Sequence, residues 1–282
     1  MLPALHVKAI TGESVLIDAG EGTQLQLNRA GISINKINII LITHMHGDHI
    51  FGLPGLLENM SLTGRTRELL IIGPHGIGGY ITESFKATYF YPRYSLYYAE
   101  INGWGSYKYG SITIEWFPVC HTIETYGYRV TYYKRPRLSK EKLEQTGLLN
   151  NPLTSKLLDK GEVKVDNRTI KIEDVIAEPA RKYCIAYTGD TAPCARIIEE
   201  VKGCDILFHE ATFASDHRYE AWEYGHSTAM DAALVAREAG VGRLVLYHYS
   251  TRYREDYSIL EKEALSIFPY TDLGVDLKEY FV

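Results

Sequence analysis

The feature that most constrains this chain is a cluster of three histidines and one aspartate directly after a short apolar run. Residues 39–42 are four aliphatic residues, three of them isoleucine, which is typical of a strand buried on both faces. The next segment, residues 43–49, has the sequence THMHGDH and supplies His44, His46, Asp48 and His49. Imidazole nitrogens and carboxylate oxygens are ligands that suit Zn²⁺. We therefore predict a metal site at the carboxyl end of a buried strand.

The spacing within this segment indicates more than one metal ion. His44 and His46 lie two residues apart, so their side chains share a face if the extended geometry continues. A turn at Gly47 then redirects Asp48 and His49, so the segment can serve two adjacent ions. The alternative is a histidine-rich surface loop, which we disfavour because an apolar strand leads directly into this spacing.

The order of apolar runs and polar loops predicts an α/β fold with two sheets and helices outside them. The expected strands lie at 14–20, 37–42, 69–72, 112–118, 184–187, 205–208 and 243–247. The expected helices begin at Pro54, at Ser227 or Thr228, and near Leu260, and they end at Gly64, Gly240 and Pro269. The ends of the strands open into polar loops, where a site can form.

Composition fits a globular protein and excludes several classes. The chain has 282 residues, of which 45% are hydrophobic and 23% charged, and it can bury a large core without disulfides. No stretch approaches the ~20 apolar residues of a membrane span, and no signal peptide is seen, so we expect a cytoplasmic protein without a membrane partner. The four cysteines are expected to be buried thiols, namely Cys120, Cys184, Cys194 and Cys204.

Residues 134–164 differ in charge from the rest of the chain. They carry eight Lys or Arg against four Asp or Glu, a local excess of +4 in a chain of net charge −5. Two short helical patterns are separated by Gly147 and by Asn151-Pro152. We interpret the segment as an arm inserted between the two halves of the chain, whose charge suits RNA phosphates. The alternative is an ordinary solvated helical hairpin.

Several motifs in order resemble the metallo-β-lactamase superfamily and, within it, the tRNase Z branch of endoribonucleases. The superfamily pattern His-x-His-x-Asp-His stands at 44–49, and the stretch FGLPGLL at 51–57 is similar to that branch. Further matching stretches lie at 18–24, 188–191, 209–212, 225–227 and 248–253. The resemblance implies an αββα sandwich of two mixed sheets in a single domain over 1–282. It also implies an inserted tRNA-binding arm, or exosite, at 134–171.

The resemblance implies two zinc ions per subunit, held by seven residues. One ion would be bound by His44, His46 and His121. The other would be bound by Asp48, His49 and His248, with Asp190 as a bridge between the two. From the residues alone, His121, Asp190 and His248 each follow an expected strand, where a structural polar residue is the alternative for each.

The same resemblance implies the reaction. A hydroxide shared by the metals would attack the phosphodiester and release the 3′ trailer of precursor tRNA, leaving a tRNA 3′-hydroxyl. Asp48 would also accept a proton, Glu210 and His226 would form an acid–base relay, and Arg252 would contact a substrate phosphate. The alternatives are a buried carboxylate at Glu210, a helix start at His226 and a surface salt bridge at Arg252.

The resemblance also implies a homodimer in which the arm of one subunit grips the tRNA cut by the other. The sequence departs from the family pattern in two places. The arm carries Asn151-Pro152 where the family often has Gly-Pro. The strand and Leu-Gly-Thr-Gly turn that usually precede the position of Pro3 in the family are not seen here, so we expect an exposed sheet edge. The competing function is a two-zinc hydrolase of small phosphodiesters or thioesters. A non-catalytic RNA-binding protein and a DNA-processing nuclease of the superfamily fit less well.

Overall fold

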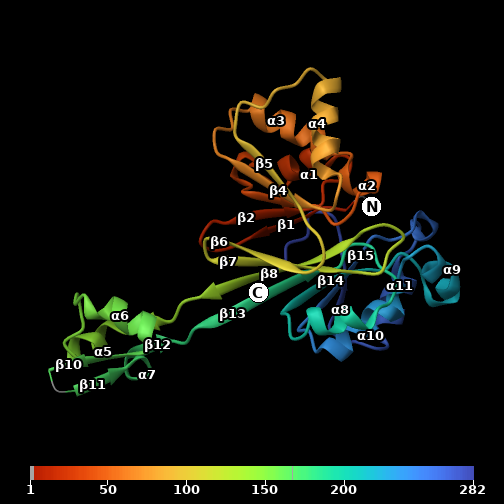
Figure 1. The fold of residues 1–282 in the computed structure, drawn as a ribbon. Coiled ribbons are helices and arrows are strands. Elements are labelled where there is room, and N and C mark those ends of the chain that lie inside the picture. The colour runs from red at the N-terminus through yellow and green to blue at the C-terminus, as the bar shows by residue number, and fades with distance from the viewer. Residues whose placement is uncertain (1–2, 167) are drawn as a thin grey trace. The chain divides into compact units, whose positions relative to one another are not determined.

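The computed structural model describes residues 3–166 and 168–282, and it divides them into two compact units (Figure 1). The larger unit joins the described residues up to Thr131 with Cys184–Val282. The smaller unit is Tyr132–Tyr183. The two units are described separately below.

The larger unit contains a five-stranded sheet in the order β1-β2-β3-β4-β5. Its strands are β1 (Leu5–Lys8), β2 (Ser14–Ile17), β3 (Ile39–Leu41), β4 (Leu69–Gly73) and β5 (Leu96–Glu100). β1 pairs antiparallel with β2, whereas the other neighbours pair in parallel. Among the described residues, β1 and β5 form the edges of this sheet.

A second sheet has seven strands in the order β16-β15-β14-β13-β8-β7-β6. Its strands are β6 (Gly105–Tyr109), β7 (Ile112–Pro118), β8 (Tyr126–Lys134), β13 (Arg181–Tyr187), β14 (Ile206–Glu210), β15 (Leu244–Tyr247) and β16 (Thr271–Leu273). The strands from β13 to β16 pair in parallel, and β6 pairs antiparallel with β7. Both sheets are therefore mixed.

Helices cover one face of each sheet (Figure 1). The first sheet is covered by α1 (Thr23–Arg29), α3 (Leu53–Leu62) and α4 (Ile77–Ala87), and the second by α8 (Ala195–Glu200), α10 (Ala229–Ala239) and α11 (Ser258–Leu265). In the first core, Leu16 and Ile40 of the sheet pack with Leu56 of α3. In the second, Leu246 packs with Ala232 of α10. Burial of these apolar side chains fixes each helix on its sheet.

The other faces of the two sheets are turned toward each other. Side chains alternate along a strand, so Ile39 and Leu41 point away from the helices that Ile40 contacts, and both are fully buried. The buried Tyr128 of β8 donates a hydrogen bond from its hydroxyl to the Ile42 carbonyl, just past β3, at 2.7 Å. The expected αββα sandwich of two mixed sheets is therefore confirmed.

The expected strands and helices lie close to where the sequence places them. Some strand ends differ from the expected ones: β14 continues to Glu210 rather than stopping at residue 208, and β2 stops at Ile17 rather than at residue 20. The loops carry the short elements η1 (Ile34–Lys36), α2 (Gly47–Ile50), η2 (Ser215–His217), α9 (Arg218–Glu223) and η3 (Thr251–Tyr253). None of the described helices is long and apolar enough to cross a membrane.

The smaller unit has its own core. It contains β9 (Arg137–Leu138), α5 (Lys140–Gln145), α6 (Leu153–Lys160), β10 (Glu162–Val165), β11 (Arg168–Lys171), α7 (Ile172–Val175) and β12 (Ile176–Glu178). Leu143 of α5 and Leu157 of α6 are buried together with Val163 and Val175. The two expected helices are therefore present, and they are held by apolar packing.

The expectation that all four cysteines are thiols is wrong for two of them. Cys184 of β13 and Cys204 just before β14 form a disulfide, and their Cα atoms lie 4.7 Å apart. The reason is topological, because β13 and β14 are neighbouring parallel strands and bring these residues side by side. Cys120 and Cys194 are free thiols, but Cys120 is exposed and Cys194 is half-buried, so the expected burial is wrong for these two.

The bond between Tyr128 and the Ile42 carbonyl links the two sheets beside the histidine segment. Replacing Tyr128 with phenylalanine leaves that buried carbonyl without its donor, so we expect Tyr128→Phe to lower the free energy of unfolding by about 1–3 kcal/mol. Urea denaturation measures this loss. Tyr133→Phe, at an exposed position of the same strand, is the control and should change stability by less than about 0.5 kcal/mol. Equal effects of the two substitutions would contradict the role of Tyr128.

Candidate metal centre

The ends of strands from both sheets deliver the site residues. His44 follows β3, Asp190 follows β13 and His248 follows β15, while Glu210 ends β14. The structure brings all seven expected metal ligands together in two groups: His44, His46 and His121, and Asp48, His49, Asp190 and His248. Within each group one possible ligand atom per residue lies within 4.8 Å of the others.

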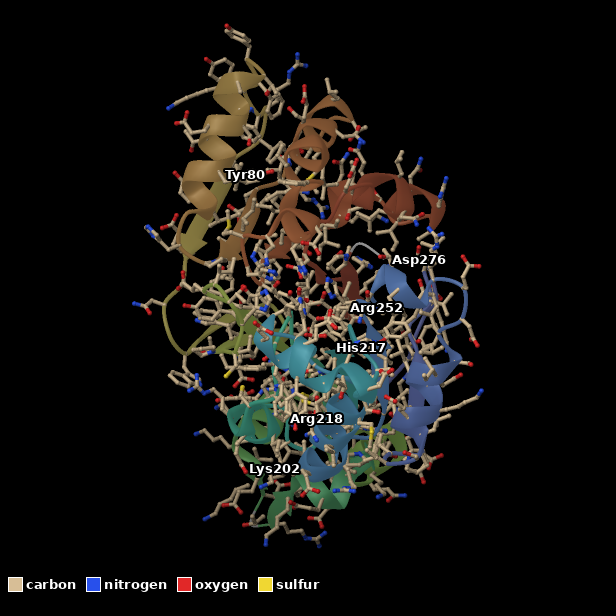
Figure 2. All side chains as sticks on the ribbon, turned by 90° about the vertical axis from the view of Figure 1, so that its right-hand side faces the viewer. Tyr80, Lys202, His217, Arg218, Arg252 and Asp276 are labelled. Carbon is tan, nitrogen blue, oxygen red and sulfur yellow. A yellow bond between two sulfur atoms is a disulfide. The ribbon has the colours of Figure 1, made fainter. Side chains whose placement is uncertain are left out.

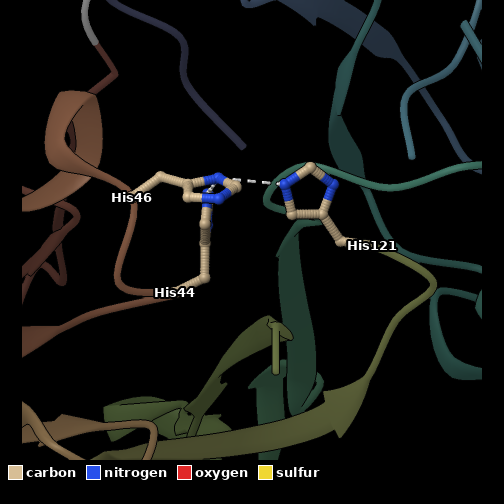
Figure 3. A group of neighbouring side chains, drawn as sticks. All are labelled: His44, His46 and His121. Atoms are coloured by element: carbon tan, nitrogen blue, oxygen red, sulfur yellow. Dashed lines mark hydrogen bonds between the residues drawn. The ribbon is translucent and has the colours of Figure 1, made fainter. Parts of the chain in front are cut away.

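The first group contains three imidazole rings that converge on one point (Figure 3). His46 Nδ1 lies 3.1 Å from His44 Nε2 and 3.2 Å from His121 Nε2. The rings of His44 and His46 stand nearly perpendicular, at 83°. Three imidazole nitrogens that face one another at this distance are an arrangement that suits a metal ion.

The second group is centred on the Asp190 carboxylate. Asp190 Oδ2 lies 3.4 Å from His49 Nε2 and 3.5 Å from His248 Nε2. The same oxygen lies 3.8 Å from His44 Nε2, which belongs to the first group. Asp48 Oδ2 completes the second group at 3.1 Å from His248 Nε2. Asp190 is thus the one carboxylate, among these residues, that borders both groups.

Hydrogen bonds on the far side of several of these rings fix which nitrogen faces the centre. His121 Nδ1 lies 2.7 Å from the Gly225 carbonyl, which can only accept, so Nδ1 carries the hydrogen and Nε2 is a free acceptor. Gly225 has φ +72°, and a Cβ there would stand 2.8 Å from His121 Nδ1, so glycine is required for this approach. The Thr43 hydroxyl donates to Asp18 and lies 3.0 Å from His44 Nδ1, from which it accepts.

Asp18 holds the histidine segment from behind. Its Oδ2 lies 2.8 Å from His49 Nδ1, and its Oδ1 accepts from the Thr43 backbone N–H at 2.8 Å. Asp18 is fully buried and has φ 61°, an uncommon backbone conformation for a residue other than glycine. Burial alone would lower the pKa of His49, but the charges of Asp18 and Asp190 raise that pKa well above its usual value. The local charge therefore favours a cation at this position.

Glu210 is the centre of a hydrogen-bond network beside the two groups. Its fully buried carboxylate accepts from the backbone N–H groups of Thr191, Thr212 and Ser227, and it lies 2.9 Å from His226 Nδ1. Burial alone would lower the pKa of His226, but the hydrogen bond and charge of Glu210 raise it. The imidazole is therefore held in one orientation and is a ready proton donor.

Thr212 links Glu210 to His248, one of the possible metal ligands. Its hydroxyl donates to Glu210 Oε2 at 2.7 Å and lies 2.9 Å from His248 Nδ1, from which it accepts. His248 has φ 59°, so its backbone is turned where β15 ends. The ring of His248 stacks on that of His226, with centres 5.5 Å apart. Nε2 of His248 is thereby directed toward Asp48 and Asp190.

Two observations show that the residues fit a metal. His49 Nε2 and Asp190 Oδ1 are buried and have no hydrogen-bond partner among the described residues, so these two polar atoms remain available to a metal ion. Burial and the neighbouring charge of His49 also lower the pKa of His44 to about 2, so this imidazole is neutral near pH 7. Neutral imidazoles and ionised carboxylates are the forms that bind metals.

Arg252 lies outside both groups. Its guanidinium pairs with Glu220 of α9, with 2.9 Å between Nη2 and Oε1. This is the surface salt bridge that the sequence analysis gave as the alternative role of Arg252. The guanidinium stands over the ring of Phe213, whose centre is 6.2 Å from that of His226. Phe213 is therefore a neighbour of both Arg252 and His226.

Four residues that orient the site were not identified from the sequence, although each lies in or beside a segment singled out there: Asp18, Thr43, Thr212 and Gly225. Their residue types are common in turns and at strand ends, and nothing in such types alone indicates a bond to a histidine far along the chain. The only available signal was their position beside the ligands or in the recurring motifs.

Comparison with known proteins gives consistent matches. The model of the Beta-lactamase superfamily domain matches residues 13–138 and 165–249. The ribonuclease Z of Ignicoccus hospitalis is 40% identical and covers 100% of this chain and 92% of its own length. That of Aeropyrum pernix is 39% identical, with 97% and 90% covered. The crystal structure of the short form of human tRNase Z superimposes with a TM-score of 0.68 at 23% identity, covering 98% of this chain and 91% of that one.

The bond from Asp18 to His49 predicts a measurable effect on metal binding. Asp18→Asn replaces the charged acceptor behind His49, so we expect the affinity for Zn²⁺ to fall about 10- to 100-fold. Competition with a chromogenic chelator measures this affinity. The control is Asp159→Asn, at an exposed position of α6, which should leave the affinity unchanged. If Asp18→Asn binds zinc as tightly as this control, Asp18 does not support the site.

Proposed function

Because the chain belongs to the ribonuclease Z family, a family of RNA-cutting hydrolases within the metallo-β-lactamase superfamily, we propose that its substrate is precursor tRNA. We propose that it cuts the phosphodiester at the 3′ trailer and leaves a 3′-hydroxyl on the tRNA. The observation that carries this proposal is the convergence of seven possible metal ligands in two groups, with Asp190 of the second group bordering the first. A relay of Glu210 and His226 beside them supports a hydrolytic role.

The two groups fit two zinc ions. His44, His46 and His121 would hold one, Asp48, His49 and His248 would hold the other, and Asp190 would bind both. Bound there, the ions would lower the pKa of a water molecule toward neutrality and offset negative charge on the phosphoryl oxygens. The neutral imidazole of His44 and the ionised Asp190 are already in the protonation states that binding requires.

Asp48 is suited to accept the proton of the attacking water. Its side chain is 38% exposed, in contrast to the buried Asp190, so it lies on the open side of the group. The contact with His248 lowers the pKa of Asp48 to about 2, and the carboxylate is therefore ionised at neutral pH. A proton taken from water during attack on phosphorus can pass to Asp48 Oδ2.

His226 is suited to supply the proton that the leaving group needs. When the bond between phosphorus and the ribose 3′ oxygen breaks, that oxygen must be protonated. Glu210 holds His226 through Nδ1, which leaves Nε2–H free to donate, and the His226 side chain is 16% exposed. Asp48 thus gains one proton and His226 loses one. After the reaction, Asp48 releases its proton to solvent and His226 takes one up, which restores the starting protonation states.

The smaller unit supplies charge for RNA binding. It holds 12 Lys or Arg against eight Asp or Glu, whereas the whole chain has net charge −5. Lys140, Lys156 and Lys160 on α5 and α6 are exposed. We propose that this unit contains the tRNA-binding arm and that, in a homodimer, it holds the tRNA that the partner subunit cuts. Arg252 would contact a phosphate near the scissile bond.

Cleavage of a labelled substrate tests the reaction. A precursor tRNA labelled at its 5′ end and carrying a short trailer should be cut once by zinc-loaded protein, near the discriminator base. Asp48→Ala removes the proton acceptor and a metal ligand, so we expect kcat to fall at least about 100-fold while binding of the tRNA persists. Asp276→Ala, at an exposed position, is the control and should cleave normally.

The outcomes separate the competing functions. Normal turnover by Asp48→Ala would refute the assignment of this residue. If the wild-type protein binds zinc and hydrolyses bis(p-nitrophenyl) phosphate but leaves the precursor tRNA intact, it is a hydrolase of small phosphodiesters instead. Measured zinc content for each variant distinguishes loss of chemistry from loss of metal.

The charge of the smaller unit predicts a second effect. Replacing Lys140, Lys156 and Lys160 together with glutamine should raise the Kd for precursor tRNA about 10-fold or more, because each lost phosphate contact weakens binding. Filter binding at several salt concentrations measures both Kd and its salt dependence. Hydrolysis of the small phosphodiester should not change. The matched control replaces exposed Lys8, Lys36 and Lys202 of the larger unit, and an equal loss of affinity there would contradict a specific role for the arm.

A further inference from the structure

Arg252 and Glu220 form a two-pronged ion pair close to the metal centre. Arg252 Nη1 donates to Glu220 Oε2 at 3.2 Å, and Nη2 donates to Oε1 at 2.9 Å. Arg252 lies in η3, four residues after His248, and Glu220 lies in α9. Figure 2 shows Arg252 near His217, whose Nδ1 lies 3.0 Å from Glu220 Oε2. Both terminal nitrogens of the guanidinium, Nη1 and Nη2, are therefore paired with the carboxylate.

The guanidinium is also held by an aromatic ring. Arg252 Cζ lies 5.3 Å from the centre of the Phe213 ring, within the range of a cation–π contact. Phe213 also neighbours His226, the proposed proton donor, with ring centres 6.2 Å apart. Arg252 thus has one contact that would persist if Glu220 moved away, and its position beside the centre does not depend on the carboxylate alone.

A carboxylate and a phosphodiester present the same two-oxygen edge to a guanidinium. We propose that Glu220 is an internal substitute for a substrate phosphate, which occupies Arg252 in the free enzyme and is displaced when RNA binds. This inference rests on the proposed function, because the incoming phosphate is that of the RNA. The exchange is feasible because the side chains of Arg252 and Glu220 are 40% and 36% exposed, and ion pairs with such access to water are weak.

The displaced carboxylate keeps a partner. His217 lies next to α9 and contacts the same Glu220 oxygen that accepts from Arg252 Nη1. When the phosphate takes Arg252, Glu220 can remain with His217 rather than lose every contact. Glu220 would therefore reduce the affinity of the site for RNA without being a ligand of the metal or a donor of protons.

The opposite interpretation makes a prediction of opposite sign. If Glu220 only supports Arg252 in a productive position, its replacement should weaken RNA binding. If Glu220 competes with the phosphate, its replacement should strengthen binding. Glu220→Gln keeps the shape of the side chain and removes its charge. Glu223→Gln removes the same charge one turn away on α9, where Glu223 forms no ion pair among the described residues.

Binding is measured with the Asp48→Ala protein, so that the RNA is not consumed. We expect Glu220→Gln to lower the Kd for precursor tRNA about 2- to 5-fold relative to Glu223→Gln. In an Arg252→Ala background the two glutamine variants should give the same Kd, because no guanidinium remains to be released. Circular dichroism of every variant checks that the fold is retained.

Two results would overturn the inference. One is a Kd for Glu220→Gln equal to or higher than that for Glu223→Gln, and the other is a gain that survives Arg252→Ala. Failure of the proposed function is read separately, from cleavage by the wild-type protein. If the wild-type protein does not cut the RNA but Glu220→Gln still tightens binding through Arg252, the inference holds and the proposed reaction does not.

Discussion

The buried charge of Asp190 is the constraint on which the rest of the site depends. Its side chain is only 3% exposed, and an ionised carboxylate at that depth is costly unless cations or donors surround it. Burial alone would raise the pKa of Asp190, but His248 and His49 hold it well below its usual value. The fold therefore has to bring several histidines to one carboxylate oxygen. It does so by placing the carboxyl ends of β3 and β15, which precede the histidines, near the end of β13, which precedes Asp190.

The groups behind the histidines follow from the same constraint. An imidazole can face Asp190 or a metal with one nitrogen only if its other nitrogen is fixed. Asp18 fixes His49, and Thr212 fixes His248. Both supports are buried, which excludes water as a competing partner. The Asp18 backbone takes a left-handed conformation, so some local strain accompanies the placement of its carboxylate.

Much of this arrangement was accessible from the sequence, and the part that was not has a common cause. The apolar run at 39–42 and the histidines after it are local features, and they predicted the buried strand and four of the seven possible ligands. The helix ending at Gly240 was predicted in the same way from a cap at Ser227 or Thr228, and the structure places that cap at Thr228. The disulfide between Cys184 and Cys204 and the pair of Arg252 with Glu220 are contacts across neighbouring elements, which depend on strand order and on side-chain direction. No local pattern encodes them.

The wide separation of the ligands along the chain has a consequence for how the protein is made. Asp48 and His248 lie 200 positions apart, yet they belong to the same group of possible metal ligands. A nascent chain that has emerged only as far as β14 already presents His44, His46 and His49 but lacks His248. The second group can close only after β15 has joined the sheet. Assembly of the complete centre is therefore one of the last events of synthesis, and the growing chain passes most of its time on the ribosome without a complete centre.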